Sequence, residues 1–306
     1  MSKNLNFIAL VLFLIILLII VKKPDSAVVQ DEIPEETVIK EEEEAKKPEV
    51  KIEPEWVVWN RVKEFHHPRF GKVLNDIESH IEDGHSYRDN HLMTWAHETT
   101  HGINSNIRNG HDGFNGFYVL NDRAILIQEP KVLLSQVAAK IPEDLRGPSY
   151  NLYLVQQRRD WNERPLYLFD EWTAYTNGSA CGIELNLAGW EFELMQAHNF
   201  NIYCLYLMKE VKSLCPEYDD RQMKAYLQWN IERTFDLLNS HPRGASVVYI
   251  VSGLGHREEV HADSSVNFFD VAGYIDLFRV SASAEDLREF MRGYFGAEWC
   301  QRIYRI

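Results

Sequence analysis

The chain has 306 residues, a formal net charge of −14 and 45% hydrophobic residues. This content suffices for one well-cored domain of roughly 250 residues, or for two small ones. The negative charge argues against a nucleic-acid partner, because a phosphate backbone is held by clustered lysines and arginines.

The N-terminus carries an uninterrupted apolar run of fifteen residues, Phe7 to Val21, followed by a pair of lysines. As a helix this run would be roughly 22 Å long, and its flanking residues can extend it toward a ~30 Å hydrocarbon core. We expect residues 1–23 to form a single-pass membrane anchor that spans through residues 5–23. A cleaved secretory signal is the alternative, although Asp25-Ser26-Ala27 is a poor cleavage site. Lysines on both sides leave the membrane side of the remaining chain open.

The stretch from residue 24 to 55 is predicted to be a disordered acidic linker. Residues 22–55 hold six lysines and twelve acidic residues, proline recurs, and no aromatic residue is present. Such a segment cannot bury enough apolar surface to fold alone. We interpret it as a spacer, with an acidic binding tail as the alternative, and expect the folded domain to span residues 56–306.

Helices dominate the predicted elements of this domain. The first covers His67 to Glu82, and the next begins after a polar cap near residues 86–90 and ends at about Ile107. A hairpin over Gly116–Gln128 follows, with Asn121-Asp122 as its two-residue turn, because both residue types tolerate positive φ.

The remaining segments are read as helices with one further strand. Helices are expected over residues 131–140, 150–161, 169–176, 188–214, 219–239, 268–280 and 284–294, and a strand over 246–251. The predicted fold class is therefore α+β and predominantly helical, with a small sheet or hairpin and a helical C-terminal half. Four cysteines without CxxC spacing could form two disulfides or remain free thiols.

The stretch TWAHETTHGIN contains the pattern HExxH inside a predicted helix. His97 and His101 stand four residues apart, so they lie on the same helix face and can point at one metal ion. Catalytic zinc sites use three protein ligands and leave a position for water. Glu98, beside the first histidine, can act as the general base toward that water. The alternative is an ordinary surface helix that carries two histidines.

The third ligand is expected in the segment LFDEWTAYTNG. Glu171 falls in the first turns of a helix, and Asp170 beside it can orient a ligand histidine. Tyr175 lies one turn later on the same face, where its phenol could donate a hydrogen bond to an oxyanion. The alternative for Glu171 is a favourable position near a helix N-terminus. Glu129 is the main rival ligand and His111 a weaker one.

Other histidines carry weaker hypotheses. His256 and His261 could supply a histidine that stabilises the transition state, or a second metal site, but we interpret their segment as a solvated charged loop. His85 and His91 are outside candidates for lining a cleft.

HETTH followed by a distant glutamate on a second helix resembles the gluzincin branch of the zincin metallopeptidases. The resemblance covers roughly residues 90–178. It implies that His97, His101 and Glu171 bind Zn²⁺ and that Glu98 activates water.

The resemblance also implies a sheet edge that holds substrate as an added strand, for which the Gly116–Gln128 hairpin is the candidate. The family usually has an aspartate four residues after the ligand glutamate, whereas this chain has Tyr175, so the subfamily stays open. The family's sheet also usually precedes the motif helix, and this hairpin follows it.

The sequence thus predicts a membrane-tethered zinc metallopeptidase that hydrolyses a peptide or protein substrate. Two alternatives stay open. One is a catalytically inactive zincin-like binding or structural protein on a membrane. The other is a zinc hydrolase of a non-peptide amide.

Overall fold

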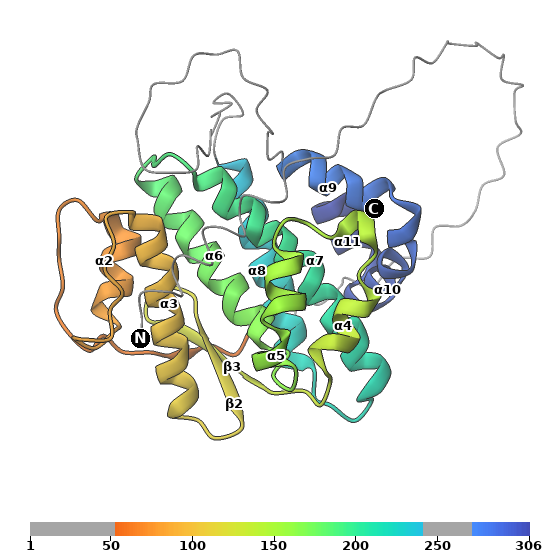
Figure 1. Cartoon of the computed structure of the whole chain (residues 1–306), viewed down its shortest axis with the longest axis horizontal. Coiled ribbons are helices and arrows are strands. Elements are labelled where there is room, and N and C mark those ends of the chain that lie inside the picture. Colours follow the sequence, from red (N-terminus) through yellow and green to blue (C-terminus); the bar gives the residue numbers. More distant parts are fainter. Residues whose placement is uncertain (1–52, 241–270) are drawn as a thin grey trace, which may run out of the picture. The chain divides into compact units, whose positions relative to one another are not determined.

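The structure, a computed structural model, describes residues 53–240 and 271–306. Most of these residues are helical, and three short strands form an antiparallel sheet (Figure 1). The predicted α+β class with a helical majority is confirmed. The predicted anchor at 5–23, the linker up to residue 52, the strand at 246–251 and both His256 and His261 lie outside the described residues. Across the described ranges, no helix combines the length and apolarity needed to span a membrane.

The predicted hairpin is confirmed and forms most of the sheet. Strands β2 (Phe114–Tyr118) and β3 (Arg123–Gln128) pair antiparallel, with Gly116 opposite Leu126. Asn121 and Asp122 both have positive φ, 55° and 58°, as a type I′ turn requires. Strand β1 (Val57–Val58), which was not predicted, pairs with the other edge of β3 and gives the order β1-β3-β2.

Helix α2 (Gly71–Ser79) is shorter than the predicted His67–Glu82 helix, which is wrong at both ends. Gly71, the first residue of α2, has a φ of +63°, so the right-handed helix cannot extend toward the N-terminus beyond it. The free amides of the first turn are capped from far away in the chain. Lys72 and Val73 donate their backbone N–H groups to the Glu184 carboxylate at 2.7 and 2.8 Å.

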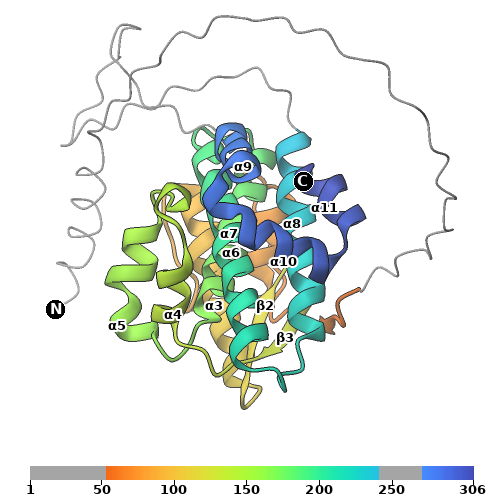
Figure 2. The same ribbon diagram turned by 90° about the vertical axis from the view of Figure 1, so that its right-hand side faces the viewer.

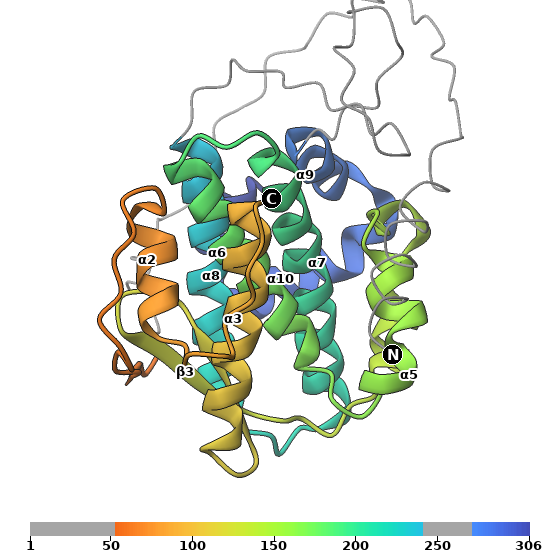
Figure 3. The same cartoon turned by 60° about the vertical axis from the view of Figure 1, so that its left-hand side comes forward.

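Helix α3 (Leu92–Asn109) contains the HExxH pattern and agrees with the predicted helix to within a few residues. Its C-terminal half lies against β2. A Cβ atom at Gly116 would stand 1.9 Å from the side chain of Ile107, so only glycine allows this close approach of helix and strand. Helix α2 packs against α3 and α6 (Figure 3).

The chain between the hairpin and the second motif forms four short helical elements. The elements are α4 (Leu134–Lys140), the 3-10 turn η1 (Glu143–Leu145), the π-helix η2 (Asn151–Gln156) and α5 (Arg158–Trp161). The expected helices over 131–140 and 150–161 are thus present in part. A π-helical turn widens the helix locally, and such turns are frequent at functional sites.

Three long helices form the centre of the domain. They are α6 (Tyr167–Glu184), α7 (Trp190–Leu214) and α8 (Arg221–Asn239). Helix α6 contains the second motif segment and packs against α3, which contains the first (Figures 1 and 3). It also packs against α7. Gly178 and Gly182 make the contact with α3 close, because Cβ atoms there would meet the Met93 carbonyl at 3.4 Å and the Met93 sulfur at 2.3 Å.

Of the three C-terminal α-helices, the first two pack against α7 and the last packs against the second (Figure 2). The C-terminal elements are α9 (Val271–Val280), η3 (Ala282–Ala284), α10 (Glu285–Phe295) and α11 (Ala297–Tyr304). The last of them was not predicted. The helical C-terminal half is confirmed for the residues described.

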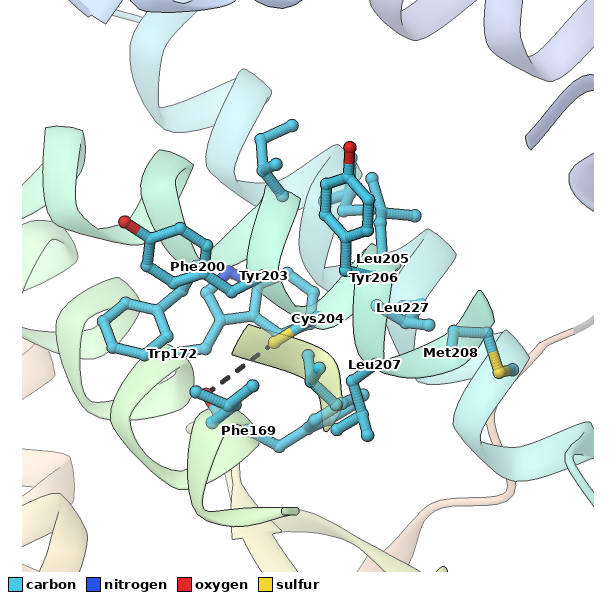
Figure 4. Packing of buried hydrophobic residues seen from close by; sticks show 14 of the residues in the cluster. Phe169, Trp172, Phe200, Tyr203, Cys204, Leu205, Tyr206, Leu207, Met208 and Leu227 are labelled. Atoms are coloured by element: carbon cyan, nitrogen blue, oxygen red, sulfur yellow. Dashed lines mark hydrogen bonds between the residues drawn. The ribbon is translucent and has the colours of Figure 1, made fainter. Parts of the chain in front are cut away.

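Much of the main core lies between α6, α7 and α8, where aromatic rings pack together with leucine side chains (Figure 4). Trp172, Phe200 and Tyr203 are fully buried there. The Cys204 thiol in the same cluster donates to the Leu168 carbonyl at 3.7 Å. All four cysteines are buried free thiols, so the alternative of two disulfides is wrong.

Candidate metal centre

Helix α3 presents the two motif histidines on one face, and their ring nitrogens converge. The Nε2 atoms of His97 and His101 are 3.1 Å apart. The His97 side chain is 9% exposed, whereas the His101 side chain is 22% exposed, so the centre is more open to solvent on the side of His101. The i and i+4 spacing on a rigid helix is the cause of this convergence.

Helix α6 brings Glu171 to the same point. Glu171 Oε2 lies 3.7 Å from His97 Nε2 and 3.5 Å from His101 Nε2. The three atoms therefore form a triangle with sides of 3.1, 3.5 and 3.7 Å. Zinc bonds of about 2.05 Å in a tetrahedron place ligand atoms about 3.3 Å apart, so this triangle fits one zinc ion.

The carboxylate oxygen that completes the triangle has no hydrogen-bond donor among the residues described. Glu171 Oε2 is buried there without one. A buried carboxylate oxygen without a donor costs free energy unless a cation or proton compensates it. Two imidazoles and one carboxylate are also a common ligand set of catalytic zinc. The residues present therefore fit a zinc ion.

Each histidine has an acidic partner on its outer nitrogen. Asp170 Oδ2 lies 3.2 Å from His101 Nδ1, as the sequence suggested for an orienting carboxylate. Glu193, at the start of α7, places Oε2 3.7 Å from His97 Nδ1. A partner at hydrogen-bond distance, as at His101, fixes the ring orientation and the tautomer of a ligand histidine, whereas the 3.7 Å separation at His97 is that of an ion pair. Gly178 makes room for Glu193, whose Oε2 would lie 3.2 Å from a Cβ at that position.

The charges of the centre are strongly coupled. Burial lowers the pKa of the His97 imidazole, but Glu171 and Glu193 raise it by more, to about 9. Burial likewise opposes the charged form of His101, and Asp170 and Glu171 hold its pKa well above the usual value. Burial would raise the pKa of Glu171, but the two imidazoles hold it well below its usual range. A zinc ion must displace the histidine protons, so its binding strengthens as the pH rises.

Glu98 is the candidate general base of the motif. It follows His97 directly in α3 and is exposed. A hydrogen bond to Asp89 raises the pKa of Tyr87 and burial raises the pKa of Tyr175, and the charge of Glu98 adds a smaller increase to both. An exposed carboxylate beside a ligand can reach a water molecule at the centre.

Tyr175 packs its ring against His97, with ring centroids 4.4 Å apart. Its hydroxyl shares a 2.6 Å hydrogen bond with the hydroxyl of Tyr153, which comes from the π-helix η2. Burial raises the pKa of both phenols well above the usual value, so both stay protonated. One hydrogen bond between two hydroxyls uses one proton, and the second proton is left for another acceptor.

The rival ligands lie elsewhere. Glu129 accepts hydrogen bonds from the Leu166 backbone N–H at 2.9 Å and from Asn115 Nδ2 at 2.6 Å. His111 Nδ1 lies 2.8 Å from the Ile107 carbonyl. Neither residue belongs to the cluster that holds His97, His101 and Glu171. His85 pairs with Glu82 and His91 with Thr94, so neither contacts the cluster residues through these bonds.

Sequence reasoning missed Glu193, Tyr153 and Asn104. Asn104 Nδ2 donates to Asp170 Oδ1 at 2.6 Å. It stands three residues after His101, and this spacing could have placed it on the ligand face of α3. Glu193 and Tyr153 reach the centre only through tertiary packing, and no local pattern marks them.

A pocket of about 490 Å³ lies on a different face of α3. Trp95 lines it, and a residue two positions before His97 points to nearly the opposite side of the helix. Phe65, Phe70 and Leu92 also line it, whereas none of the three cluster residues does. The pocket and the candidate metal centre are therefore separate.

The chain matches no protein-family model, no curated protein and no solved structure. Its function is therefore inferred from the geometry and chemistry of the candidate centre.

Proposed function

We propose that this chain is a zinc-dependent metallopeptidase of the gluzincin type. The observation that carries the proposal is the triangle of His97 Nε2, His101 Nε2 and Glu171 Oε2, with sides of 3.1 to 3.7 Å. Its dimensions suit tetrahedral zinc, and its edge at His101 is open to solvent. Bound zinc would polarise the scissile carbonyl and lower the pKa of a water molecule toward ~7.

The side chains around the centre supply the remaining chemistry. Glu98 accepts the proton of the attacking water and passes it to the leaving amine, as a general base and then a general acid. The free hydroxyl proton of the Tyr153–Tyr175 pair is donated to the oxyanion that develops on the carbonyl oxygen. Asp170 keeps the His101 imidazole in orientation, and the Glu193 carboxylate adds a negative charge beside the His97 imidazole.

A substrate strand cannot pair with β2 at Tyr118, although the sequence predicted that the whole hairpin could offer an edge for such pairing. The Tyr118 backbone N–H donates to Asn104 Oδ1 at 2.8 Å, and its carbonyl accepts from Asn177 Nδ2 at 3.0 Å. Peptide that binds along β2 would have to use the earlier residues, near Phe114, which is exposed. The segments before residue 53 complete the proposal, as a membrane anchor and an acidic spacer.

The test is hydrolysis of a peptide library by the full chain and by Glu98→Gln, with metal content measured in both. We expect Glu98→Gln to keep zinc and to lose cleavage, because the amide cannot accept the water proton. Cleavage by Glu98→Gln at the parent rate would refute the mechanism. A parent that binds zinc but cleaves only non-peptide amides would identify a hydrolase of another substrate class. A zinc-bound parent without turnover would indicate a binding protein.

A further inference from the structure

A chain of hydrogen bonds connects the edge strand β2 to the candidate metal centre. The Tyr118 backbone N–H donates to Asn104 Oδ1 at 2.8 Å, and Asn104 Nδ2 donates to Asp170 Oδ1 at 2.6 Å. Asp170 Oδ2 then faces His101 Nδ1 at 3.2 Å. We propose that Asn104 is a positioning residue that locks Asp170, and through it His101, for metal binding. This inference rests on the proposed zinc function.

The orientation of the Asn104 amide follows from its partners. A backbone N–H can only donate, so the atom that faces Tyr118 must be the carbonyl oxygen. The NH₂ group then faces Asp170, whose carboxylate can only accept when it is ionised. Asn104 is 1% exposed, so no water competes for these bonds. An asparagine side chain provides both an acceptor and a donor, and it is short enough to fit between these two partners.

Both oxygens of Asp170 are used by this arrangement. One accepts from Asn104 and the other faces His101, so the carboxylate cannot rotate without losing a bond. The acidic partner of His97 is less closely engaged, since Glu193 Oε2 lies 3.7 Å from His97 Nδ1 and accepts no hydrogen bond from the described part of the chain. The two ligand histidines are therefore held differently, and the His101 ring is the one whose orientation is fixed by the fold.

The position of Asn104 in the fold explains why it can act in this way. It lies on α3, three residues after His101, while Asp170 belongs to α6 and Tyr118 to β2. One side chain thus ties together the three elements that meet at the centre. A positioning role of this kind affects metal affinity and coordination, and it does not require contact with substrate.

The test compares Asn104→Asp with Asn177→Asp in the full chain. Asn104→Asp preserves the shape and the bond to the Tyr118 N–H, but it places an anionic oxygen against Asp170. Asn177 binds the carbonyl of the same Tyr118 and is equally buried. Its amide nitrogen donates to Thr100 and Tyr118, and its oxygen accepts from Arg233, so these bonds do not involve Asp170 or the cluster. It is the matched control for a buried asparagine at this strand.

Zinc affinity is measured by competition with a chromogenic chelator, and Co²⁺ absorption reports the coordination geometry. We expect Asn104→Asp to weaken zinc binding by roughly 10- to 100-fold and to change the Co²⁺ spectrum, the usual scale for a lost outer partner. Asn177→Asp should stay within about twofold of the parent. Parent-like zinc affinity in Asn104→Asp, or equal losses in both variants, would overturn the role of Asn104.

A second variant exchanges the two residue types, Asn104→Asp with Asp170→Asn. The amide introduced at position 170 donates through Nδ2 to the carboxylate introduced at position 104, and it faces His101 through Oδ1. Every link of the chain then has a donor and an acceptor. This exchange should recover most of the lost affinity, and it answers the question if Asn104→Asp alone does not fold.

No recovery of zinc affinity in a folded exchange variant would contradict the inference. A parent that binds no zinc would instead refute the proposed function, and this inference with it. The two failures are distinguishable, because the first leaves the zinc affinity of the parent intact.

Discussion

Two groups of three side chains in the described part of this molecule have the composition of a metal site, and they differ in how their polar atoms are satisfied. The first is the cluster of His97, His101 and Glu171. The second, near the hairpin turn, comprises Asp76, His80 and Asp122. In both groups the candidate ligand atoms lie within 4.8 Å of one another. Distance and residue type alone do not separate them.

The second group is a closed hydrogen-bond network. His80 is fully buried, with Nδ1 2.6 Å from the Asp76 carbonyl and Nε2 2.9 Å from Asp122 Oδ1. Asp76 Oδ2 accepts from the Tyr118 hydroxyl at 2.6 Å and from the Asn121 N–H at 3.0 Å. The network fastens the turn to α2.

In the first group Glu171 Oε2 has no hydrogen-bond donor among the described residues, and the ring nitrogens converge on it. A candidate metal centre is thus distinguished from a hydrogen-bond network by converging ligand atoms, one of which has no donor among the described residues.

The largest expected effect separates the two groups by metal binding. His101→Ala should lower zinc affinity by more than the roughly 10- to 100-fold that loss of an outer partner causes, because a direct ligand is removed. His80→Ala should leave zinc affinity unchanged. Chelator competition on both variants checks this. Loss of zinc in His80→Ala would mean that the closed network binds the metal.

Although His80→Ala should leave zinc affinity unchanged, it should lower the stability of the fold. His80→Ala removes a buried side chain and leaves Asp76 and Asp122 without its hydrogen bonds, so we expect a loss of about 2–4 kcal/mol in the free energy of unfolding. Urea unfolding measures this, and His85→Ala, at an exposed histidine, is the control. Equal stability of the His80 and His85 variants would show that the network contributes nothing to the fold.

Tyr175→Phe tests whether the open side of the first group performs chemistry. It removes a hydroxyl that the proposal assigns to the oxyanion, so kcat should fall by roughly a hundredfold. Zinc content should stay the same, because Tyr175 touches His97 only through its ring. A change confined to KM would place the hydroxyl in substrate binding and outside the chemical step.

The smallest effect on the candidate metal centre is expected at Glu129, the rival ligand. Both of its carboxylate oxygens accept hydrogen bonds, as the polar atoms of the second group do. Burial raises its pKa from 4.5 to about 7. The folded state therefore binds this proton more tightly, so the contribution of Glu129 to the free energy of unfolding is highest below pH 4.5 and falls as the pH rises toward about 7. Glu129→Gln should remove this dependence, on the order of 3 kcal/mol, and keep zinc. Urea unfolding of both proteins across this window is the measurement. An unchanged slope would assign the dependence to other groups.

Local sequence signals predicted the parts of the fold that local physics determines. The Asn121-Asp122 turn follows from positive φ at two tolerant residues, and α3 follows from its apolar pattern. The start of α2 could not be predicted, because its cap is Glu184, more than a hundred residues away. The strand β1 is only two residues long and exists through its pairing with β3.

The residues of the candidate centre also fall into those that local spacing predicts and those that depend on tertiary packing. His97 and His101 are set by one helix, so their spacing alone predicted their convergence. Glu171 needed a second helix, and the structure places it where the sequence suggested. Glu193 and the Asn104 chain depend on how α7 and β2 pack against α3, which no spacing reveals.

Metal stoichiometry of the purified full chain, beside Glu171→Gln, tests the central claim most directly. Mass spectrometry of the metal content should find one zinc ion per chain in the parent and little or none in the variant, whose amide oxygen is a poor ligand. A parent that holds no metal even after zinc is supplied would contradict the account. Zinc retained at full occupancy in Glu171→Gln would contradict it equally, since the third ligand would then lie elsewhere.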